Sequence, residues 1–295
     1  MRRTARIGNR LVGDGQPCFV VAEIGINHNG DLDIARKLIA AAALAECDAV
    51  KFQKRTIEAV YTPEELACPR ETPYGDTNGD LKRGLEFGEE EYRAIDEYCR
   101  IHSILWYASA WDRESVDFLA RFDPPCFKIA SAMLTDDDLL RHHRSYGKPI
   151  IMSTGMSTLE QIDHAVEVLG TENLILLQCT STYPAKPEEL NLEAIHTLRD
   201  RYDVPVGYSG HEVGLATTVA AAVLGACMVE RHITLDRAMW GSDQAASVEP
   251  HGFRRLVRDI RVNASARGDG IKRVYDSEIP IQDKLRREAK RALVG

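Results

Sequence analysis

A short apolar run, an amphipathic stretch and a second apolar run follow one another in residues 18–53, which read CFVVAEIGINHNGDLDIARKLIAAAALAECDAVKFQ. Cys18–Ile24 has the length and composition of a buried strand, and so has Ala49–Gln53. Between them, the apolar residues of Asp31–Leu44 recur at helical spacing, and Asp31 is suited to cap the helix. A strand, a helix and a strand in this order are typical of a parallel sheet buried on both faces.

The same unit recurs until the chain has supplied eight strands and eight helices. The further predicted strands are Ile104–Ala108, Cys126–Ile129, Pro149–Ser153, Leu174–Cys179, Val206–Ser209 and Met228–Arg231, and the further helices lie near 89–102, 113–122, 136–146, 158–169, 191–202, 214–225 and 251–265. Eight such units close into a barrel, and 295 residues suit a barrel of about 250 residues with additions. An open doubly wound sheet would need a phosphate-binding glycine pattern after the first strand, which Glu23–Gly30 lacks. We therefore predict an α/β fold, a (β/α)8 TIM barrel.

Both ends of the chain lie outside this pattern. Residues 1–17 are predicted to form a short hairpin over the N-terminal mouth of the barrel, with Arg6–Val12 turning at Gly13-Asp14-Gly15. We expect the catalytic barrel to occupy residues 1–270 and a C-terminal helical tail to occupy residues 271–295.

The composition excludes several classes of protein. Lys and Arg number 37 against 45 Asp and Glu, and the resulting charge of −8 argues against a nucleic-acid partner. No apolar run approaches the roughly 18–20 residues of a membrane helix, and the basic N-terminus lacks the apolar stretch of a signal peptide. The seven cysteines contain no Cys-x-x-Cys pair, which is typical of reduced, mostly buried thiols. We therefore predict a cytoplasmic protein, alone or as a homo-oligomer, that binds neither nucleic acid nor membrane.

Polar side chains gather where the predicted strands end, which is where barrels of this kind form their active sites. They are Glu23, Lys51, Gln53, Ser109, Lys128, Ser131, Ser153, Ser181, Tyr183, Ser209, His211, Glu230 and His232, with Asn27 and His28 after the first strand and Asp243 after the last. The two lysines interrupt otherwise apolar strands. A lysine at a sheet edge can reach solvent, but a closed barrel has no edge, and a lysine in its interior needs an anionic partner. Lys51 and Lys128 therefore predict a site for a phosphate and a carboxylate.

Two histidines and two carboxylates leave alternatives open. His211 and His232 end neighbouring strands, where they either share a metal ion or form a hydrogen-bonded pair without one. Glu23 is expected to be a pocket carboxylate or the partner of Lys51. Asp243 lies in a loop, where it either orients a hydroxylated substrate or acts as a base, or is an ordinary surface residue.

Seven motifs in chain order together resemble the sialic acid synthase family of phosphoenolpyruvate-condensing enzymes. They are AEIGINHNG (22–30), VKFQ (50–53), KIAS (128–131), STGM (153–156), CTSTYP (179–184), GYSGH (207–211) and ERH (230–232). The resemblance implies condensation of phosphoenolpyruvate with the open-chain aldehyde of an N-acetylated hexosamine, such as N-acetylmannosamine. The products would be phosphate and a nonulosonic acid such as N-acetylneuraminate.

The resemblance also implies a role for each site residue. Phosphoenolpyruvate would be held by Lys51, Ser109, Lys128, Ser131, Ser153 and Ser209, with Ser181 near the phosphate; the sugar would be faced by Glu23, Gln53, Tyr183 and Asp243. Lys51, Lys128, Glu23 and Asp243 are the predicted catalytic residues. His211 and His232 would bind a divalent ion, typically Mn2+, with Mg2+ and Co2+ as alternatives. Either Glu23 or a metal-bound hydroxide would take the proton of the attacking water.

This chain departs from the family pattern at three points. Met133 stands where many members carry an acidic residue, and Ser181 stands where some carry Asn. The chain ends where the family's antifreeze-like domain, which contributes an arginine to the partner's site, would begin. The long connection Lys54–Gly88 is of the kind that forms functional lids, and either it supplies the missing cover and cation or the site is more open. The candidate cations are Arg70, Lys82 and Arg83.

Two alternative functions follow from these departures. The first keeps the condensation but changes the aldehyde to a pentose phosphate, as in the octulosonate phosphate synthases. The second is a non-catalytic barrel that binds a sugar phosphate. The paired lysines and histidines favour an enzyme over a pure binder.

Overall fold

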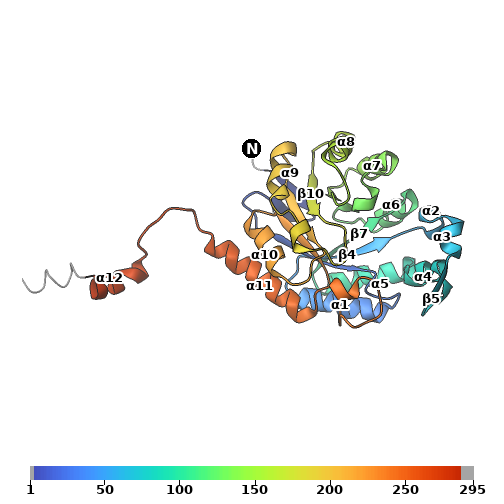
Figure 1. Ribbon diagram of the computed structural model, residues 1–295, viewed down its shortest axis with the longest axis horizontal. Helices are drawn as coiled ribbons and strands as arrows, with labels where there is room; N and C mark the ends of the chain where they lie inside the picture. The colour runs from blue at the N-terminus through green and yellow to red at the C-terminus, as the bar shows by residue number, and fades with distance from the viewer. Residues whose placement is uncertain (1–2, 287–295) are drawn as a thin grey trace, which may run out of the picture. The chain divides into compact units, whose positions relative to one another are not determined.

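The computed structural model of the protein describes residues 3–286. Contacts between residues divide the chain into two units, Met1–Arg261 and Val262–Gly295. The first unit contains all the strands of the barrel, and Figure 1 shows helices on the outside of these strands. Within residues 3–286, no helix combines the length and the apolar character needed to cross a bilayer.

Eight parallel strands close into a barrel and follow the order of the chain. They are β3 (Phe19–Gly25), β4 (Ala49–Lys54), β7 (Leu105–Ala110), β8 (Phe127–Ile129), β9 (Ile150–Ser153), β10 (Leu174–Cys179), β11 (Val206–Gly210) and β12 (Met228–His232). The last strand, β12, pairs with the first, β3, and so closes the ring. Every predicted strand is present, and the predicted (β/α)8 barrel is confirmed.

Helices surround the strands. They are α1 (Leu32–Leu44), α5 (Glu89–Ile101), α6 (Arg113–Ala120), α7 (Asp137–Ser145), α8 (Leu159–Leu169), α9 (Ala194–Tyr202), α10 (Ala216–Val223) and α11 (Pro250–Ala266), with short 3-10 turns at Ser131–Met133, Pro187–Glu189 and Gln244–Ala246. The side chain of Asp31 caps α1, as predicted, by accepting hydrogen bonds from the backbone N–H groups of Asp33 and Ile34.

Side chains of each strand alternate between two environments. In β3, Val20, Ala22 and Ile24 pack in the apolar layer that includes helix residues such as Leu38 of α1. Phe19 and Val21 belong to a separate cluster inside the barrel. Because successive strand residues point to opposite faces, Glu23 points into the barrel as well.

The N-terminal hairpin consists of β1 (Thr4–Ile7) and β2 (Arg10–Gly13). The hairpin turns at residues 8–9, inside the predicted strand Arg6–Val12, so its predicted turn at Gly13-Asp14-Gly15 is wrong, although a turn does lie there, after β2. That segment instead leads from the hairpin toward β3, with the Asp14 N–H bonded to the Arg3 carbonyl at 2.9 Å. The inner side chains Ala5, Ile7 and Val12 are buried with the first inward residues of the barrel strands. The hairpin therefore closes the N-terminal mouth.

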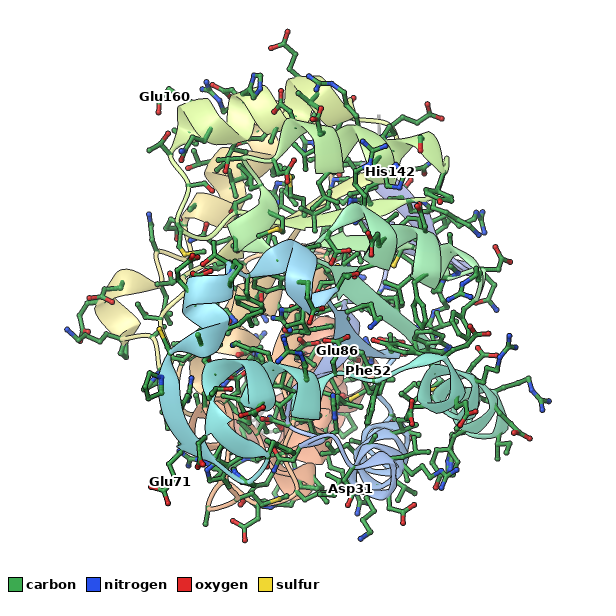
Figure 2. All side chains as sticks on the ribbon, turned by 90° about the vertical axis from the view of Figure 1, so that its right-hand side faces the viewer. Asp31, Phe52, Glu71, Glu86, His142 and Glu160 are labelled. Atoms are coloured by element: carbon green, nitrogen blue, oxygen red, sulfur yellow. The ribbon has the colours of Figure 1, made fainter. Side chains whose placement is uncertain are left out.

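The connection Lys54–Gly88 is an ordered insertion and not an irregular loop. It contains α2 (Ile57–Val60), α3 (Pro63–Ala67), β5 (Pro69–Thr72), β6 (Gly75–Thr77) and α4 (Asn78–Leu85). The hydroxyl of Tyr74 donates a hydrogen bond of 2.8 Å to the Asn29 carbonyl, and its ring meets Trp240 at 5.9 Å. The insertion is therefore joined to the loops after β3 and β12. Figure 2 views the molecule from the side of this insertion, and shows it in front of part of the barrel with Glu71 at its edge.

The second unit contains the end of α11, a 3-10 turn at Asp276–Glu278 and α12 (Ile279–Leu285). A helix in the tail is thus present, while the tail residues after Arg286 lie outside the described part of the chain.

Candidate active site

A cavity of about 250 Å³ lies at the C-terminal ends of the barrel strands. It is lined by Glu23, Lys51, Gln53, Ser109, Trp111, Lys128, Ala130, Ser131, Ala132, Ser153, Met156, Cys179, Ser181, Tyr183, Ser209, His211, Glu230 and His232. All the predicted catalytic, substrate-binding and metal-binding residues except Asp243 are among them. The fold therefore brings together side chains from every strand of the barrel.

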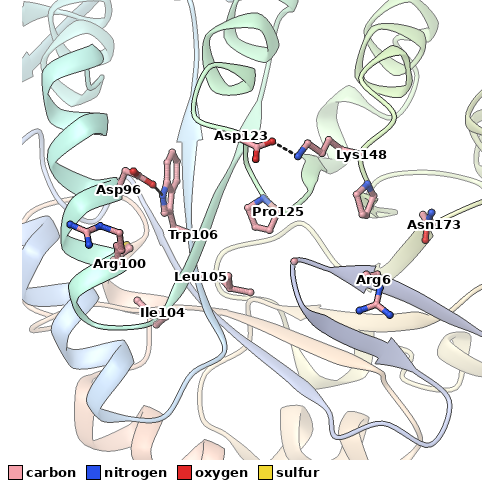
Figure 3. A pocket seen from close by; sticks show the side chains of 13 residues that line it. Arg6, Asp96, Arg100, Ile104, Leu105, Trp106, Asp123, Pro125, Lys148 and Asn173 are labelled. Carbon is pink, nitrogen blue, oxygen red and sulfur yellow. Dashed lines mark hydrogen bonds and ion pairs between the residues drawn. The ribbon is translucent and has the colours of Figure 1, made fainter.

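A larger cavity, of about 560 Å³, lies at the opposite end of the strands, because its lining includes Leu105, the first residue of β7, and Pro149, which directly precedes β9. Figure 3 shows the side chains that line it. It contains none of the predicted site residues. Its acidic side chains are engaged in local contacts, since Asp123 pairs with Lys148 at 2.5 Å and Asp96 accepts a hydrogen bond from the Trp106 indole at 2.7 Å. We therefore place the chemistry in the smaller cavity, where charged groups are buried and atoms are left without partners.

Lys51 lies between two buried carboxylates. Its Nζ is 2.9 Å from Glu23 Oε1 and 3.5 Å from Glu230 Oε1, and none of the three residues is more than 5% exposed. Strand register fixes this arrangement, because Glu23 of β3 stands beside Lys51 of β4. In each carboxylate Oε2 is buried without a hydrogen-bond partner. These two oxygens are available to a bound ligand.

The two carboxylates differ in acidity. Burial raises the pKa of Glu23 to about 7, although Lys51 opposes the shift. Burial would also raise the pKa of Glu230, but Lys51 and Lys128 outweigh it and hold that pKa below its usual value. A pair of acids with separated pKa values is typical of acid–base chemistry near neutral pH.

Lys128 is a buried ammonium with uncharged partners. Its Nζ donates to Ser153 Oγ at 2.7 Å and to the Ile129 carbonyl at 3.2 Å. No carboxylate of the described residues lies within ion-pair distance of it, and burial lowers its pKa. An ammonium in this position is suited to bind an anion.

Hydroxyl groups converge beside Lys128. Ser131 Oγ accepts a hydrogen bond of 3.0 Å from the Gly155 N–H. A Cβ atom at Gly155 would lie 2.2 Å from Ser181 Oγ and 2.9 Å from Ser131 Oγ, so only glycine leaves room for both hydroxyls. A backbone approach of this kind, with hydroxyls and an ammonium around it, is typical of a phosphate site.

His211 and His232 lie side by side, with ring centroids 5.6 Å apart. His211 Nδ1 is 2.7 Å from the Thr180 carbonyl, and His232 Nδ1 is 3.7 Å from Asp243 Oδ2. His211 Nδ1 is thus within hydrogen-bond distance of an oxygen, which leaves its Nε2 free, whereas the Asp243 oxygen is beyond that distance and His232 Nδ1 is buried without a hydrogen-bond partner. Burial lowers the pKa of His232 to about 4, so this ring is neutral at physiological pH.

These donors fit a divalent ion that keeps open positions. Imidazoles are typical ligands of such ions, and of these two only His211 has its Nδ1 oriented by a carbonyl. Within residues 3–286, no set of three His, Cys, Asp or Glu side chains lies close enough to hold an ion. The protein would thus supply two ligands, and water or substrate would supply the others.

The NeuB family profile matches residues 38–272 of this chain. The chain belongs to the NeuB family. The human N-acetylneuraminate-9-phosphate synthase is 38% identical over 281 residues, which cover 94% of this chain and 78% of that protein. The N,N'-diacetyllegionaminic acid synthase of Legionella pneumophila is 35% identical, with coverage of 93% and 80%.

Solved structures agree with this membership. The N-acetylneuraminic acid synthetase of Leptospira borgpetersenii has a TM-score of 0.84 at 31% identity, covering 97% of this chain and 99% of that one. A truncated 3-deoxy-D-arabino-heptulosonate 7-phosphate synthase of Thermotoga maritima, 16% identical with a TM-score of 0.69, shares the barrel fold.

Three residues lie differently from expectation in this NeuB family member. Asp243 does not line the cavity, and its Oδ2 lies 3.7 Å from His232 Nδ1, beyond hydrogen-bond distance. Asn27 and His28 also lie outside the cavity lining. The Asn27 amide donates to the Ile233 carbonyl, and His28 stacks on Phe87 at 4.0 Å. Asn27 and His28 therefore hold loops in place.

The expected cations of the insertion do not reach the cavity. Arg83 pairs with Glu58 at 3.0 Å, and Lys82 lies over the Tyr61 ring at 5.0 Å. Arg70 lies 3.5 Å from the Asn78 amide oxygen and lines no part of the site either. The hypothesis that these three cations complete the site is therefore wrong.

Sequence analysis placed Glu230 at a strand end but assigned no role to it. Strand alternation could have assigned it to the cavity, since Glu230 and His232 are two residues apart in β12 and both face the cavity. The residue between them, Arg231, faces away and forms a buried ion pair with Glu212 at 3.0 Å. Cys179 and Trp111 also line the cavity, and Cys179 Sγ is 3.9 Å from His211 Nδ1.

Proposed function

We propose that this protein condenses phosphoenolpyruvate with the open-chain aldehyde of an N-acetylated hexosamine, and releases phosphate and a nonulosonic acid such as N-acetylneuraminate. One observation carries the proposal. Lys128, a buried ammonium without a carboxylate partner, lines the same cavity as the imidazoles of His211 and His232. NeuB family membership and relatives named for nonulosonic acid synthesis support it.

Phosphoenolpyruvate would bind on the Lys128 side of the cavity. Its phosphate would be held by Lys128, Ser131 and Ser181 around the Gly155 backbone. Lys51, Ser109, Ser153 and Ser209 would complete the donor site. Fixed cations and hydroxyls hold the enol in one orientation, and so reduce the entropic part of the barrier.

His211 and His232 would hold the divalent ion, for which Mn2+ is our first choice. When bound, the ion supplies Lewis-acid polarisation of a carbonyl oxygen. Gln53 and Tyr183, which also line the cavity, would orient the sugar, and Asp243, whose Oδ2 is 3.7 Å from His232 Nδ1, would act on the orientation of that ring.

Glu23 would move the protons. The C3 carbon of the enol forms a bond to the aldehyde carbon, and protonated Glu23 gives its proton to the aldehyde oxygen. The resulting carboxylate then takes a proton from the water that adds to C2. The bond between C2 and the phosphate ester oxygen then breaks, phosphate leaves with the electron pair and takes up the proton of the C2 hydroxyl, and C2 becomes a keto carbon. A pKa of about 7 lets Glu23 act in both directions at neutral pH.

The test is mass spectrometry of the product made from phosphoenolpyruvate, Mn2+ and a panel of aldehydes. The panel contains N-acetylmannosamine, related N-acetylated hexosamines and a pentose 5-phosphate. We expect a nine-carbon keto acid and equimolar phosphate, both abolished by a chelator. An eight-carbon product would favour the octulosonate alternative. Absence of any carbon–carbon bond formation with the whole panel would exclude the proposal.

A further inference from the structure

A buried ion pair joins the two residues that flank the histidines of the cavity. Glu212 directly follows His211, and Arg231 directly precedes His232. Arg231 Nη1 is 3.0 Å from Glu212 Oε1, and each of these two residues is 1% exposed. Neither of them lines the cavity. The ion pair can therefore act on the cavity only through the backbone that it shares with the two histidines.

The backbone pairing between β11 and β12 ends just before the first histidine. Its last pair is Gly210 with Arg231. His232 is held on the other side of β12, where it pairs with Glu23 of β3. His211 and the loop after it thus lie beyond the pairing of β11 with β12, and the position of this loop relative to β12 depends on other contacts.

The side chain of Arg231 supplies such contacts. Its guanidinium donates hydrogen bonds to the backbone carbonyl of Glu212 and, at 2.9 Å, to that of Gly214. It also donates to Thr218 Oγ1 of α10 at 2.6 Å. A guanidinium is suited to this role because its donors are fixed in one plane. One side chain of β12 therefore binds the loop at two backbone positions and binds the helix after the loop at a third point.

Glu212 completes the connection from the side of the loop. Its Oε1 accepts hydrogen bonds from the hydroxyls of Thr217 and Thr218 at 2.8 and 2.7 Å, and its Oε2 accepts one from the Tyr208 hydroxyl at 2.9 Å. A Cβ atom at Gly210 would lie 2.5 Å from Glu212 Oε2, so glycine leaves room for the carboxylate. Both oxygens are bonded, and the loop is thereby fixed to β11 and to α10.

Stability alone does not account for a buried ion pair. Removal of two charges from water offsets much of their attraction, and apolar residues of similar volume often stabilise a protein equally well. Charge-assisted hydrogen bonds add a defined geometry, because each has a direction. The bond between His211 Nδ1 and the Thr180 carbonyl fixes that ring to the loop after β10, but not to His232. The ion pair is the element that relates the two histidines to each other.

We propose that Arg231 and Glu212 are positioning residues that hold the imidazoles of His211 and His232 in place for a divalent ion. This inference rests on the proposed function, in which these two rings bind the ion. A site to which the protein would supply two ligands gains affinity when both ligands are ordered before the ion arrives. The ion pair orders the loop that carries the first ligand relative to the strand that carries the second.

The experiment measures the dissociation constant of Mn2+ for the metal-free protein, from the electron paramagnetic resonance signal of the free ion. Arg231→Lys keeps the charge but not the planar donors, and Glu212→Gln keeps the volume but not the charge. Arg261→Lys is the matched control. Arg261 also joins a carboxylate, Asp48 Oδ2 at 2.9 Å, and a backbone carbonyl, but it lines no part of the cavity.

We expect the dissociation constant of Mn2+ to rise about ten- to a hundredfold in Arg231→Lys, because outer contacts of metal ligands have effects of this size. The rise should be smaller in Glu212→Gln, which keeps the bonds from Arg231 to the loop carbonyls. The control should keep the wild-type value. Thermal unfolding of the metal-free proteins is measured in parallel, since a purely structural role would lower the melting temperature without changing the affinity.

The inference is overturned if the dissociation constant of folded Arg231→Lys does not rise above that of the control. If Arg231→Lys does not fold, the same criterion applies to Glu212→Gln, and failure of both variants to fold would identify the pair as a stabiliser of the barrel. Absence of Mn2+ binding to the wild type would also refute the inference.

The two proposals fail separately in this experiment. A wild type that binds Mn2+ but forms no keto acid would exclude the condensation, while a higher dissociation constant in Arg231→Lys would still support the positioning role. Condensation by the wild type, with equal Mn2+ affinity in all the variants, would exclude the positioning role alone.

Discussion

The two ends of the barrel interior are built from the same strands but bury opposite kinds of side chain. At the N-terminal end, Ile7 and Val12 of the hairpin pack on Phe19 and Met228 in an apolar cluster. At the C-terminal end, lysines, carboxylates and imidazoles are buried, and several of their atoms have no partner. Apolar packing stabilises a fold, whereas buried unpartnered charge destabilises it. One end therefore holds the barrel together, and the other end contains the candidate active site.

The sharpest test of this division is Lys128→Met. We expect kcat/KM for phosphoenolpyruvate to fall by about a thousandfold, because a preorganised charge next to the phosphate is lost. The melting temperature should not fall, since the replacement also removes a buried ammonium that has no carboxylate partner. A variant that unfolds, or that keeps its activity, would contradict the division.

Glu23→Gln tests the acid–base part. We expect activity to fall by about a hundredfold, and the limb of the pH–rate profile near the wild-type pKa of about 7 to disappear. Stability changes as well. Because the folded-state pKa lies above the usual value of 4.5, Glu23 stabilises the fold at low pH, and this contribution is lost as the pH rises toward 7. Chemical denaturation at several pH values should show a flatter profile in Glu23→Gln.

Ile7→Ala tests the other end. Removal of a fully buried side chain from the hairpin should lower the free energy of unfolding by about 2–4 kcal/mol. We expect unchanged kcat/KM at a temperature where the variant is folded. Urea unfolding, together with steady-state kinetics, checks both statements, and a selective loss of activity would show that the two ends are coupled.

The smallest effect is expected for Lys148→Gln in the cavity of Figure 3. Its ion pair with Asp123 is mostly exposed, and such pairs contribute below about 1 kcal/mol. Kinetics and thermal unfolding should both match the wild type. Loss of activity in this variant would mean that the larger cavity takes part in the reaction.

The barrel and most of the cavity could be predicted because both depend on the alternation of side chains between the two faces of each strand. Apolar residues at positions 20, 22 and 24 pack outward, and the same rule points Glu23 inward. Applied to β12, this rule would also have shown that Glu230 faces the cavity together with His232. The turn of the hairpin could not be placed in this way, because the glycines at 8 and at 13–15 suit turns equally. The burial of Ile7 and Val12 against the inward residues of the barrel selects the turn at residues 8–9. This burial depends on tertiary packing, which the local sequence does not show.

The stacking of Arg55 on Trp111 could not be predicted from the sequence around either residue. The two residues are far apart in the chain and become neighbours only through the pairing of β4 and β7. The insertion was equally hidden, because helices of four to eight residues and strands of three or four are too short for a periodic signal.

The pairing of β3 with β12 has a consequence for how activity is acquired during folding. This register sets His232 beside Glu23, so residues from the first and last strands of the ring become neighbours only at the final seam. Tyr74 connects the loops that follow these two strands, since its hydroxyl donates to the Asn29 carbonyl and its ring packs against Trp240. A barrel in which β3 and β12 are not yet paired could already contain Lys128 and the serine hydroxyls around it. It would not yet have His232 beside Glu23. Turnover in a refolding experiment thus reports completion of the ring, and it should be the last signal to recover.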